Sequence, residues 1–175
     1  MSAYEPFDLI VGGDIAFAWG VKDIAAANNT GAWARLRDVK RLVVLISLAA
    51  GTGSEHVTVE LQQAKDAEGD GAKVLQLSKL YYKAGADLTA IDSWTREDAI
   101  SRKDRANSWV SSEAGAATLQ LAVAVVIDED DLDTNNDFAF VRLKIDDPGS
   151  ARQGVAHYIA AGKRYAGTDS PGVNA

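Results

Sequence analysis

Residues 57–77 have the sequence VTVELQQAKDAEGDGAKVLQL, which carries the clearest structural signal in the chain. Every second residue from 57 to 61 is apolar and its neighbours are polar, which predicts a β-strand with one buried and one wetted face. Gly69 and Gly71 supply the positive φ angles that a tight reversal needs. The stretch therefore predicts a β-hairpin.

The second arm of this hairpin loses its regular alternation after Leu77. Leu75 and Leu77 fall on one face of an extended strand, whereas Leu80 and Tyr82 fall on the other. One extra residue at a β-bulge would bring both halves onto the same face, so we predict a bulge at this point.

Short apolar segments separated by Gly, Asn and Asp clusters recur along the rest of the chain, as is typical of an all-β domain. Strands are predicted at 14–21, 40–49, 56–64, 73–82, 108–111, 118–128, 138–146 and 153–160. Eight strands in one domain favour a β-sandwich, of a jelly-roll-like kind. Short helical segments are predicted at 23–27 and 96–106.

The domain organisation follows from these segments and from the polar ends of the chain. We expect an extended N-terminal arm at 1–13, a β-sandwich at 14–166 and a flexible C-terminal tail at 167–175, where Gly, Pro and polar residues gather. A chain of 175 residues fits one such domain.

Composition narrows the classes of function. The formal charge of −7 opposes binding to nucleic acid or to an anionic membrane surface. The chain has no cysteine, which excludes disulfides and thiolate chemistry. The start of the chain is acidic, unlike a secretory signal, and the apolar run 42–50 is too short to span a bilayer. We expect synthesis in the cytoplasm and no membrane partner.

The acidic stretch 128–137 is the most conspicuous candidate for a metal site. The first three ligand positions of a calcium-binding loop are matched by Asp131, Asp133 and Asn135. The turn glycine of that loop is replaced by Asn136, and the position of its bidentate glutamate is taken by Arg142. We expect a solvated loop between two strands, with a looser cation site as the alternative.

No catalytic set emerges from the sequence. His56 and His157 are far apart and lack the spacing of a zinc site, and residues 51–55 do not form the elbow of a serine hydrolase. We therefore expect neither an enzyme nor a bound cofactor.

Two strands, at 42–46 and 121–127, are apolar on both faces, which indicates burial on both sides. Loops or the N-terminal segment of the same chain would cover the second face, or another subunit would do so. Candidate residues for a subunit interface are Trp19, Trp33, Leu42, Val44, Ile46 and Tyr158. Trp33, Trp94 and Trp109, near predicted loops or short strands, could alternatively stack on a glycan, although packing is the commoner use of such rings.

Several segments spread over most of the chain together match the pattern of one known family. These are 22–27 with Gly31 and Trp33, 57–66 leading to 71–73, 130–133 with Phe138, Val141 and Arg142, and Tyr158-Ile159 with Arg164-Tyr165. In these segments the chain resembles the head decoration, or cement, proteins of tailed bacteriophages. It departs from them in the highly charged segment 102–105 and in the small residues of 160–162.

The resemblance implies a β-sandwich or jelly-roll body that forms a homotrimer on the outer capsid surface and stabilises the shell. It makes the major capsid protein and further copies of this chain the expected partners. Within the arm, the residues expected to face the capsid are Tyr4, Glu5, Pro6 and Phe7. The alternatives are a glycan-binding module of the virion and a tail-tube or head-completion protein.

Overall fold

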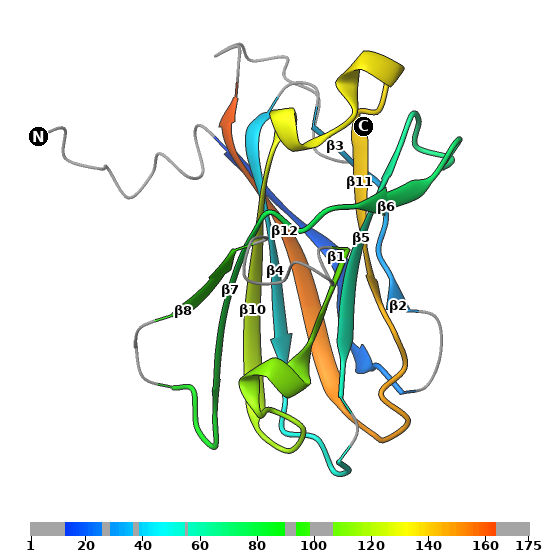
Figure 1. Cartoon of the computed structure of the whole chain (residues 1–175). Coiled ribbons are helices and arrows are strands. Elements are labelled where there is room, and N and C mark those ends of the chain that lie inside the picture. Colours follow the sequence, from blue (N-terminus) through cyan, green and yellow to red (C-terminus); the bar gives the residue numbers. More distant parts are fainter. Residues whose placement is uncertain are drawn as a thin grey trace, which may run out of the picture.

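The computed structural model describes residues 13–25, 29–36, 39–54, 56–89, 94–98 and 107–163 as two antiparallel β-sheets packed face to face (Figure 1). Sheet A contains, in spatial order, β1 (Gly13–Asp23), β12 (Gln153–Lys163), β4 (Val39–Leu48), β10 (Gln120–Asp128), β7 (Lys79–Gly85) and β8 (Thr95–Asp98). Sheet B contains β2 (Asn29–Thr30), β11 (Phe140–Ile145), β5 (Thr58–Ala64) and β6 (Lys73–Leu75), while β3 (Ala34–Arg35) also pairs with β11 and β9 (Ser108–Val110) with β5. Three short 3-10 helices are η1 (Ser111–Ala114), η2 (Glu129–Asp131) and η3 (Thr134–Asn136). The predicted all-β sandwich is confirmed.

The strand order is that of a jelly roll. Strand β1 pairs with the last strand, β12, in sheet A, and β2 and β3 pair with β11 in sheet B. Further inward along the chain, β4 pairs with β10 in sheet A and β5 pairs with β9 in sheet B. Such nested pairs, distributed alternately over two sheets, produce the double Greek key of this fold.

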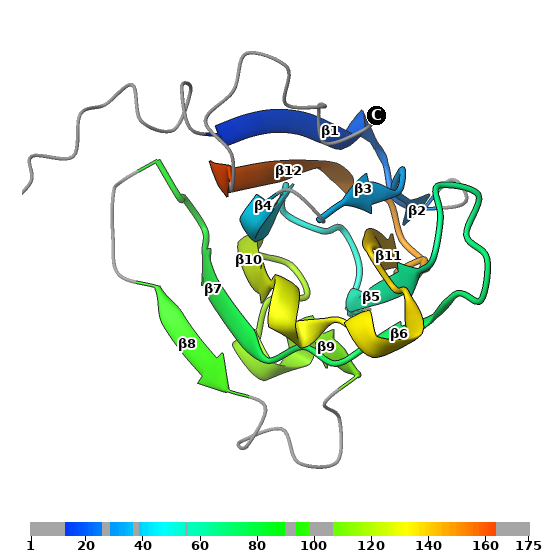
Figure 2. The same ribbon diagram turned by 90° about the horizontal axis from the view of Figure 1, so that it is seen from above.

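The core lies between the two sheets, which surround it when the molecule is viewed from above (Figure 2). Strand β10 shows the underlying pattern, because its residues alternate between buried and partly exposed along its whole length. The largest fully buried side chains are Trp109, Tyr158, Ile24, Leu36, Leu42, Ile46, Leu61, Leu75, Leu77, Leu80, Leu121 and Leu143.

One buried tyrosine links the two sheets. The hydroxyl of Tyr158 on β12 accepts a hydrogen bond from the backbone N–H of Leu143 and donates one to the carbonyl of Ala32, both at 2.9 Å. Burial raises the pKa of the Tyr158 hydroxyl, which therefore stays protonated and able to donate. Gly31 leaves room for it, since a Cβ there would lie 2.5 Å from the Tyr158 oxygen.

A buried arginine holds two loops together at one end of the sandwich. The Arg152 side chain donates to the carbonyls of Ala49, Ala116, Ala117 and Leu119 at 2.9, 3.2, 3.4 and 2.6 Å. These carbonyls belong to the loops after β4 and before β10. Arg152 is only 2% exposed, so the four carbonyls substitute for the water that its charge loses on folding.

The predicted hairpin is confirmed, but the predicted bulge is wrong. Strands β5 and β6 pair antiparallel, and Gly69 and Gly71 adopt φ angles of 91° and 62° between them. The loss of alternation after Leu77 instead marks a crossing, because β6 belongs to sheet B and β7 to sheet A. The side chains change face where the chain changes sheet, so no inserted residue is needed.

The two predicted helical segments are not helical where the structure describes them. Strand β1 ends at Asp23, whose carboxylate accepts the backbone N–H groups of Ala25 and Arg152. A side chain that satisfies nearby N–H groups favours a turn over a helix. Residues 96–98 of the second segment belong to strand β8. Residues 26–28 and 99–106, the arm up to residue 12 and the tail lie outside the described residues.

The described residues include no helix that is long and apolar enough to cross a membrane.

Candidate assembly surface

The outer face of sheet A, which points away from sheet B, carries apolar side chains on its central strands. The strand register arranges them in two rows that run across the sheet. One row contains Ile15, Ile159, Val43 and Val126, and the next contains Phe17, His157, Leu45, Ala124 and Tyr81. All of them are at least partly exposed. Apart from the imidazole of His157 and the hydroxyl of Tyr81, these two rows lack the polar side chains that usually cover the solvent side of an antiparallel sheet.

Strand β1, at one edge of this face, exposes the most apolar surface. The side chains of Ile15, Phe17 and Val21 are 53, 61 and 77% exposed. Single exposed apolar residues are common on protein surfaces, but extended apolar patches mark interaction sites. Because Ile15 and Phe17 continue the two rows, they form part of one patch with the centre of the sheet.

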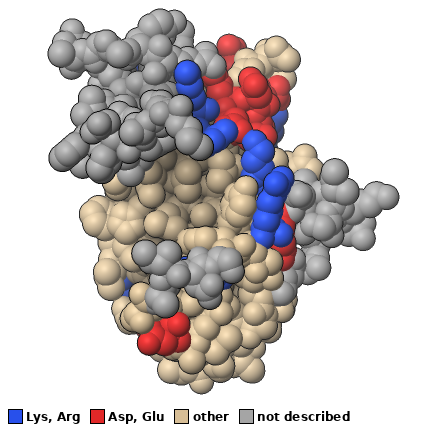
Figure 3. All heavy atoms as spheres, turned by 90° about the vertical axis from the view of Figure 1, so that its left-hand side faces the viewer, with Lys and Arg blue, Asp and Glu red and all other residues tan. Residues whose placement is uncertain are grey.

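Charged side chains lie along the opposite side of the patch. Lys79 and Lys83 on β7 pair with Val126 and Ala122 at its margin, and Arg96 on β8 pairs with Tyr81. Figure 3, which views this side of the molecule, shows basic side chains in a line beside a broad uncharged area. An apolar centre with a charged margin is the usual composition of a protein–protein interface.

The outer face of sheet B is different, because its polar side chains pair with one another. Arg142 donates to Gln62 at 2.9 Å, and Gln62 donates to Glu60 at 2.9 Å. The guanidinium of Arg142 also lies 4.4 Å from the centre of the Trp33 ring. This face is suited to contact with water, and the two sheets therefore differ in their need for a covering partner.

Most of the residues proposed for a subunit interface are wrong, because they form the core of a single chain. Leu42, Val44, Ile46 and Tyr158 are each 0% exposed, and Trp19 is 8% exposed. They fill the space between the sheets and present no surface to another copy. The sequence indicates burial of β4 and β10 on both sides. Within the described part of the chain only their inward face, to which these residues belong, is buried, and the outward residues are partly exposed.

The outward residues of β4, Val43 and Leu45, were missed although the sequence contains a signal for them. They share their alternation with Arg41 and Ser47 at the two ends of the same strand, whereas the inward set has a charged residue, Lys40, at one end only. A charged and a hydroxyl-bearing residue in one alternating set indicate the solvent side. The alternating set that is polar at both ends of the strand is therefore the one that faces outward.

The tryptophans offer little surface for stacking on a glycan. Trp109 is 0% exposed and packs against Tyr82, with ring centres 5.4 Å apart. Trp33 is half-buried, with Arg142 over its ring and the backbone of Gly69 at its edge. In the described part of the chain, Trp94 is the only tryptophan with an exposed ring, at 38%.

The acidic stretch 128–137 is held by hydrogen bonds and ion pairs from the protein itself. The carboxylate of Asp128 accepts from Arg41 at 2.8 Å and from Lys79 at 2.6 Å. Asp131 caps the N–H of Asp128 at 2.8 Å, and Asp133 is paired with Lys73. Within the described residues, no group of three or more acidic or histidine side chains is arranged to hold a metal ion.

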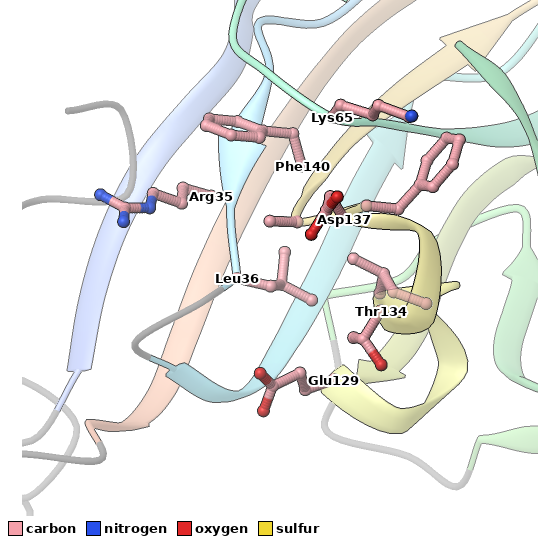
Figure 4. Close-up of a pocket in the computed structure, with 10 residues that line it drawn as sticks. Arg35, Leu36, Lys65, Glu129, Thr134, Asp137 and Phe140 are labelled. Atoms are coloured by element: carbon pink, nitrogen blue, oxygen red, sulfur yellow. The ribbon is translucent and has the colours of Figure 1, made fainter. Parts of the chain in front are cut away.

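A pocket of about 510 Å³ opens beside this acidic stretch (Figure 4). It is lined by Arg35, Leu36, Lys65, Glu129, Leu132, Thr134, Asp137, Phe138, Ala139 and Phe140. Figure 4 shows Leu36 and Thr134 toward its centre, whereas the charged ends of Arg35 and Lys65 lie at opposite margins. Its walls combine both signs of charge with aromatic rings, so they do not favour one class of ligand.

The residues proposed to contact a capsid, Tyr4, Glu5, Pro6 and Phe7, lie outside the described residues. Comparison of the chain with models of protein families and with curated protein sequences finds no match. The outer face of sheet A is therefore the feature on which a functional proposal must rest.

Proposed function

We propose that this chain is a structural protein of a tailed-phage virion, which binds the outer surface of the capsid as a homotrimer and stabilises the shell. The observation that carries the proposal is the apolar outer face of sheet A, with Val43 and Leu45 at its centre. Such a face gains free energy when another protein surface removes it from water.

The size of this face is sufficient for a stable contact. Neighbouring strands lie about 4.8 Å apart and each residue advances about 3.3 Å, so five strands of about eight residues cover roughly 600 Å². A standard protein interface buries about 800 Å² on each partner. The area of these five strands already includes the charged margin on β7, and it exceeds the roughly 500 Å² per partner that a specific interface needs, so one contact between copies can be built here.

The resemblance to decoration proteins supports the capsid as the setting. The jelly-roll order agrees with it, since this fold is frequent in virus capsid proteins, although it also occurs in lectins and carries no function by itself. The formal charge of −7 suits a site on the outside of the shell, away from the packaged DNA.

The proposed protein acts by mass action and not by chemistry. A protein that binds the assembled shell but not its separate subunits shifts the equilibrium toward the shell. A trimer that attaches at three points binds more strongly than a single copy, because the second and third contacts form at high effective concentration. Residues Tyr4 to Phe7 are the proposed attachment points.

The experiment is to add the purified chain to undecorated heads of the phage that carries it and to count bound copies. Hundreds of copies per head are expected, and deletion of residues 2–7 should weaken binding whereas deletion of 168–175 should not. An unchanged affinity after the first deletion would remove the arm from the proposal. A few copies at one vertex would instead favour a head-completion or tail protein.

A further inference from the structure

We propose that contact between copies through the outer face of sheet A depends on the protonation state of His157, so that acid separates the subunits. The inference rests on the proposed self-association of this face and adds that pH regulates this association. Imidazole is the side chain that ordinarily changes its charge between pH 5 and 8. His56 and His157 are the only histidines in the chain.

His157 lies in the middle of the apolar patch. It is on β12, between Phe17 on β1 and Leu45 on β4, which are its direct partners across the sheet. The rings of Phe17 and His157 have their centres 4.7 Å apart. The Nδ1 atom of His157 is already buried and has no hydrogen-bond partner. A copy that covers the patch would therefore meet the imidazole as part of an apolar surface.

The charged groups of the neighbouring strands lie away from this imidazole. On β1 they are Asp14, Lys22 and Asp23, and on β4 they are Lys40 and Arg41. Each of them is three or more residues along its strand from the partner of His157. On β12 itself no charged residue occurs between Gln153 and Ala161. The described strands therefore place no carboxylate beside His157 to balance a positive charge.

The direction of the pH effect follows from desolvation. Covering the face removes water from His157, and this costs more for the charged imidazolium than for the neutral ring. We therefore expect association to be weaker in acid than at pH 8. Each copy contributes its His157 imidazole to the contact, so the free energy of association that is lost in acid increases with the number of covered faces.

Sedimentation velocity on the full chain between pH 8 and pH 5 tests this inference. For the natural sequence we expect the association constant to fall by about tenfold, a factor within the usual range for coupled equilibria. His157→Leu should associate equally at both pH values, and His56→Gln should keep the pH dependence of the natural chain. His157→Gln, which preserves polarity, gives a second variant without a titrating ring should the leucine variant not fold.

The outcomes separate the inference from the proposed function. Oligomers that persist unchanged at pH 5, or a pH effect that survives in both His157 variants, would overturn the role of His157 and leave self-association standing. A chain that is monomeric at every pH would overturn both.

Discussion

The hydroxyl of Tyr158 on β12 lies 2.9 Å from the backbone nitrogen of Leu143 on β11, so one side chain connects the two sheets of the sandwich. The same oxygen donates to the carbonyl of Ala32, and both partners are therefore satisfied by a single buried group. Because the hydroxyl and the N–H lie inside the protein, loss of either leaves a buried polar group without its partner.

We predict that Tyr158→Phe lowers the free energy of unfolding by about 2 kcal/mol, since it leaves the Leu143 N–H and the Ala32 carbonyl unpaired. Urea denaturation measures the change. Tyr81→Phe, on the outer face of sheet A, is the matched control and should cost about 0.5 kcal/mol or less. Equal costs for the two variants would contradict the importance of the inter-sheet hydrogen bonds.

Gly31→Ala should destabilise the fold, because its Cβ would lie 2.5 Å from the Tyr158 oxygen and would displace that hydroxyl. We expect a loss of about 2 kcal/mol or more, as for overpacking in a core. Gly20→Ala provides the comparison, since a Cβ at Gly20 meets nothing within 4 Å. Thermal unfolding measures the melting temperatures of both variants, and equal values would contradict the predicted clash at position 31.

Arg152→Met should lower the free energy of unfolding by about 3 kcal/mol, because four loop carbonyls lose their common donor. Arg152→Lys should recover little of this loss, since one ammonium does not reproduce the spread donors of a guanidinium. The exposed Arg96→Met is the control, with a cost of about 1 kcal/mol or less. Chemical denaturation of the three variants measures these differences, and a harmless Arg152→Met would show that water can replace the side chain.

From the hydrogen bonds to Asp128, we predict that the stability of the protein depends on pH. Hydrogen bonds from Arg41 and then Lys79 lower the pKa of the Asp128 carboxyl in the folded state. A lowered pKa in the folded state stabilises the protein at pH values above the ordinary carboxyl pKa of about 4, and this contribution disappears as the pH falls through the lower, folded value.

Asp128→Asn should therefore be less stable than the natural chain at pH 7, by about 1 kcal/mol, and equally stable in strong acid. Denaturation curves at a series of pH values below 7 measure the difference. Asp130→Asn, at an exposed position of the same turn, should follow the natural chain throughout. A constant difference between Asp128→Asn and the natural chain, down to the lowest pH, would assign the effect to something other than ionisation.

Alternation of apolar residues predicts most of the long strands, because burial of one face constrains every second residue. It predicts the hairpin around Gly69 and the doubly apolar strands β4 and β10. It does not predict the two-residue strands β2 and β3, which are too short to show a period. These strands depend on tertiary pairing with β11.

The location of the apolar patch illustrates a second limit of the sequence. Both alternating sets of β4 are apolar, so composition alone does not decide whether the set that contains Val44 or the set that contains Val43 faces the other sheet. The packing of sheet B against sheet A resolves this choice, because Val44 is fully buried between the sheets whereas Val43 and Leu45 stay partly exposed. Only the polar residues at the strand ends signal it beforehand.

The mass of the chain in solution at pH 8 tests the central proposal most directly. Analytical ultracentrifugation at micromolar concentration should give three times the 18.6 kDa of one chain. Leu45→Lys, at the centre of the outer face of sheet A, should reduce the mass to that of one chain, whereas Gln62→Lys on sheet B should leave the trimer intact. A natural chain that sediments with the mass of a single copy at every concentration would contradict the account.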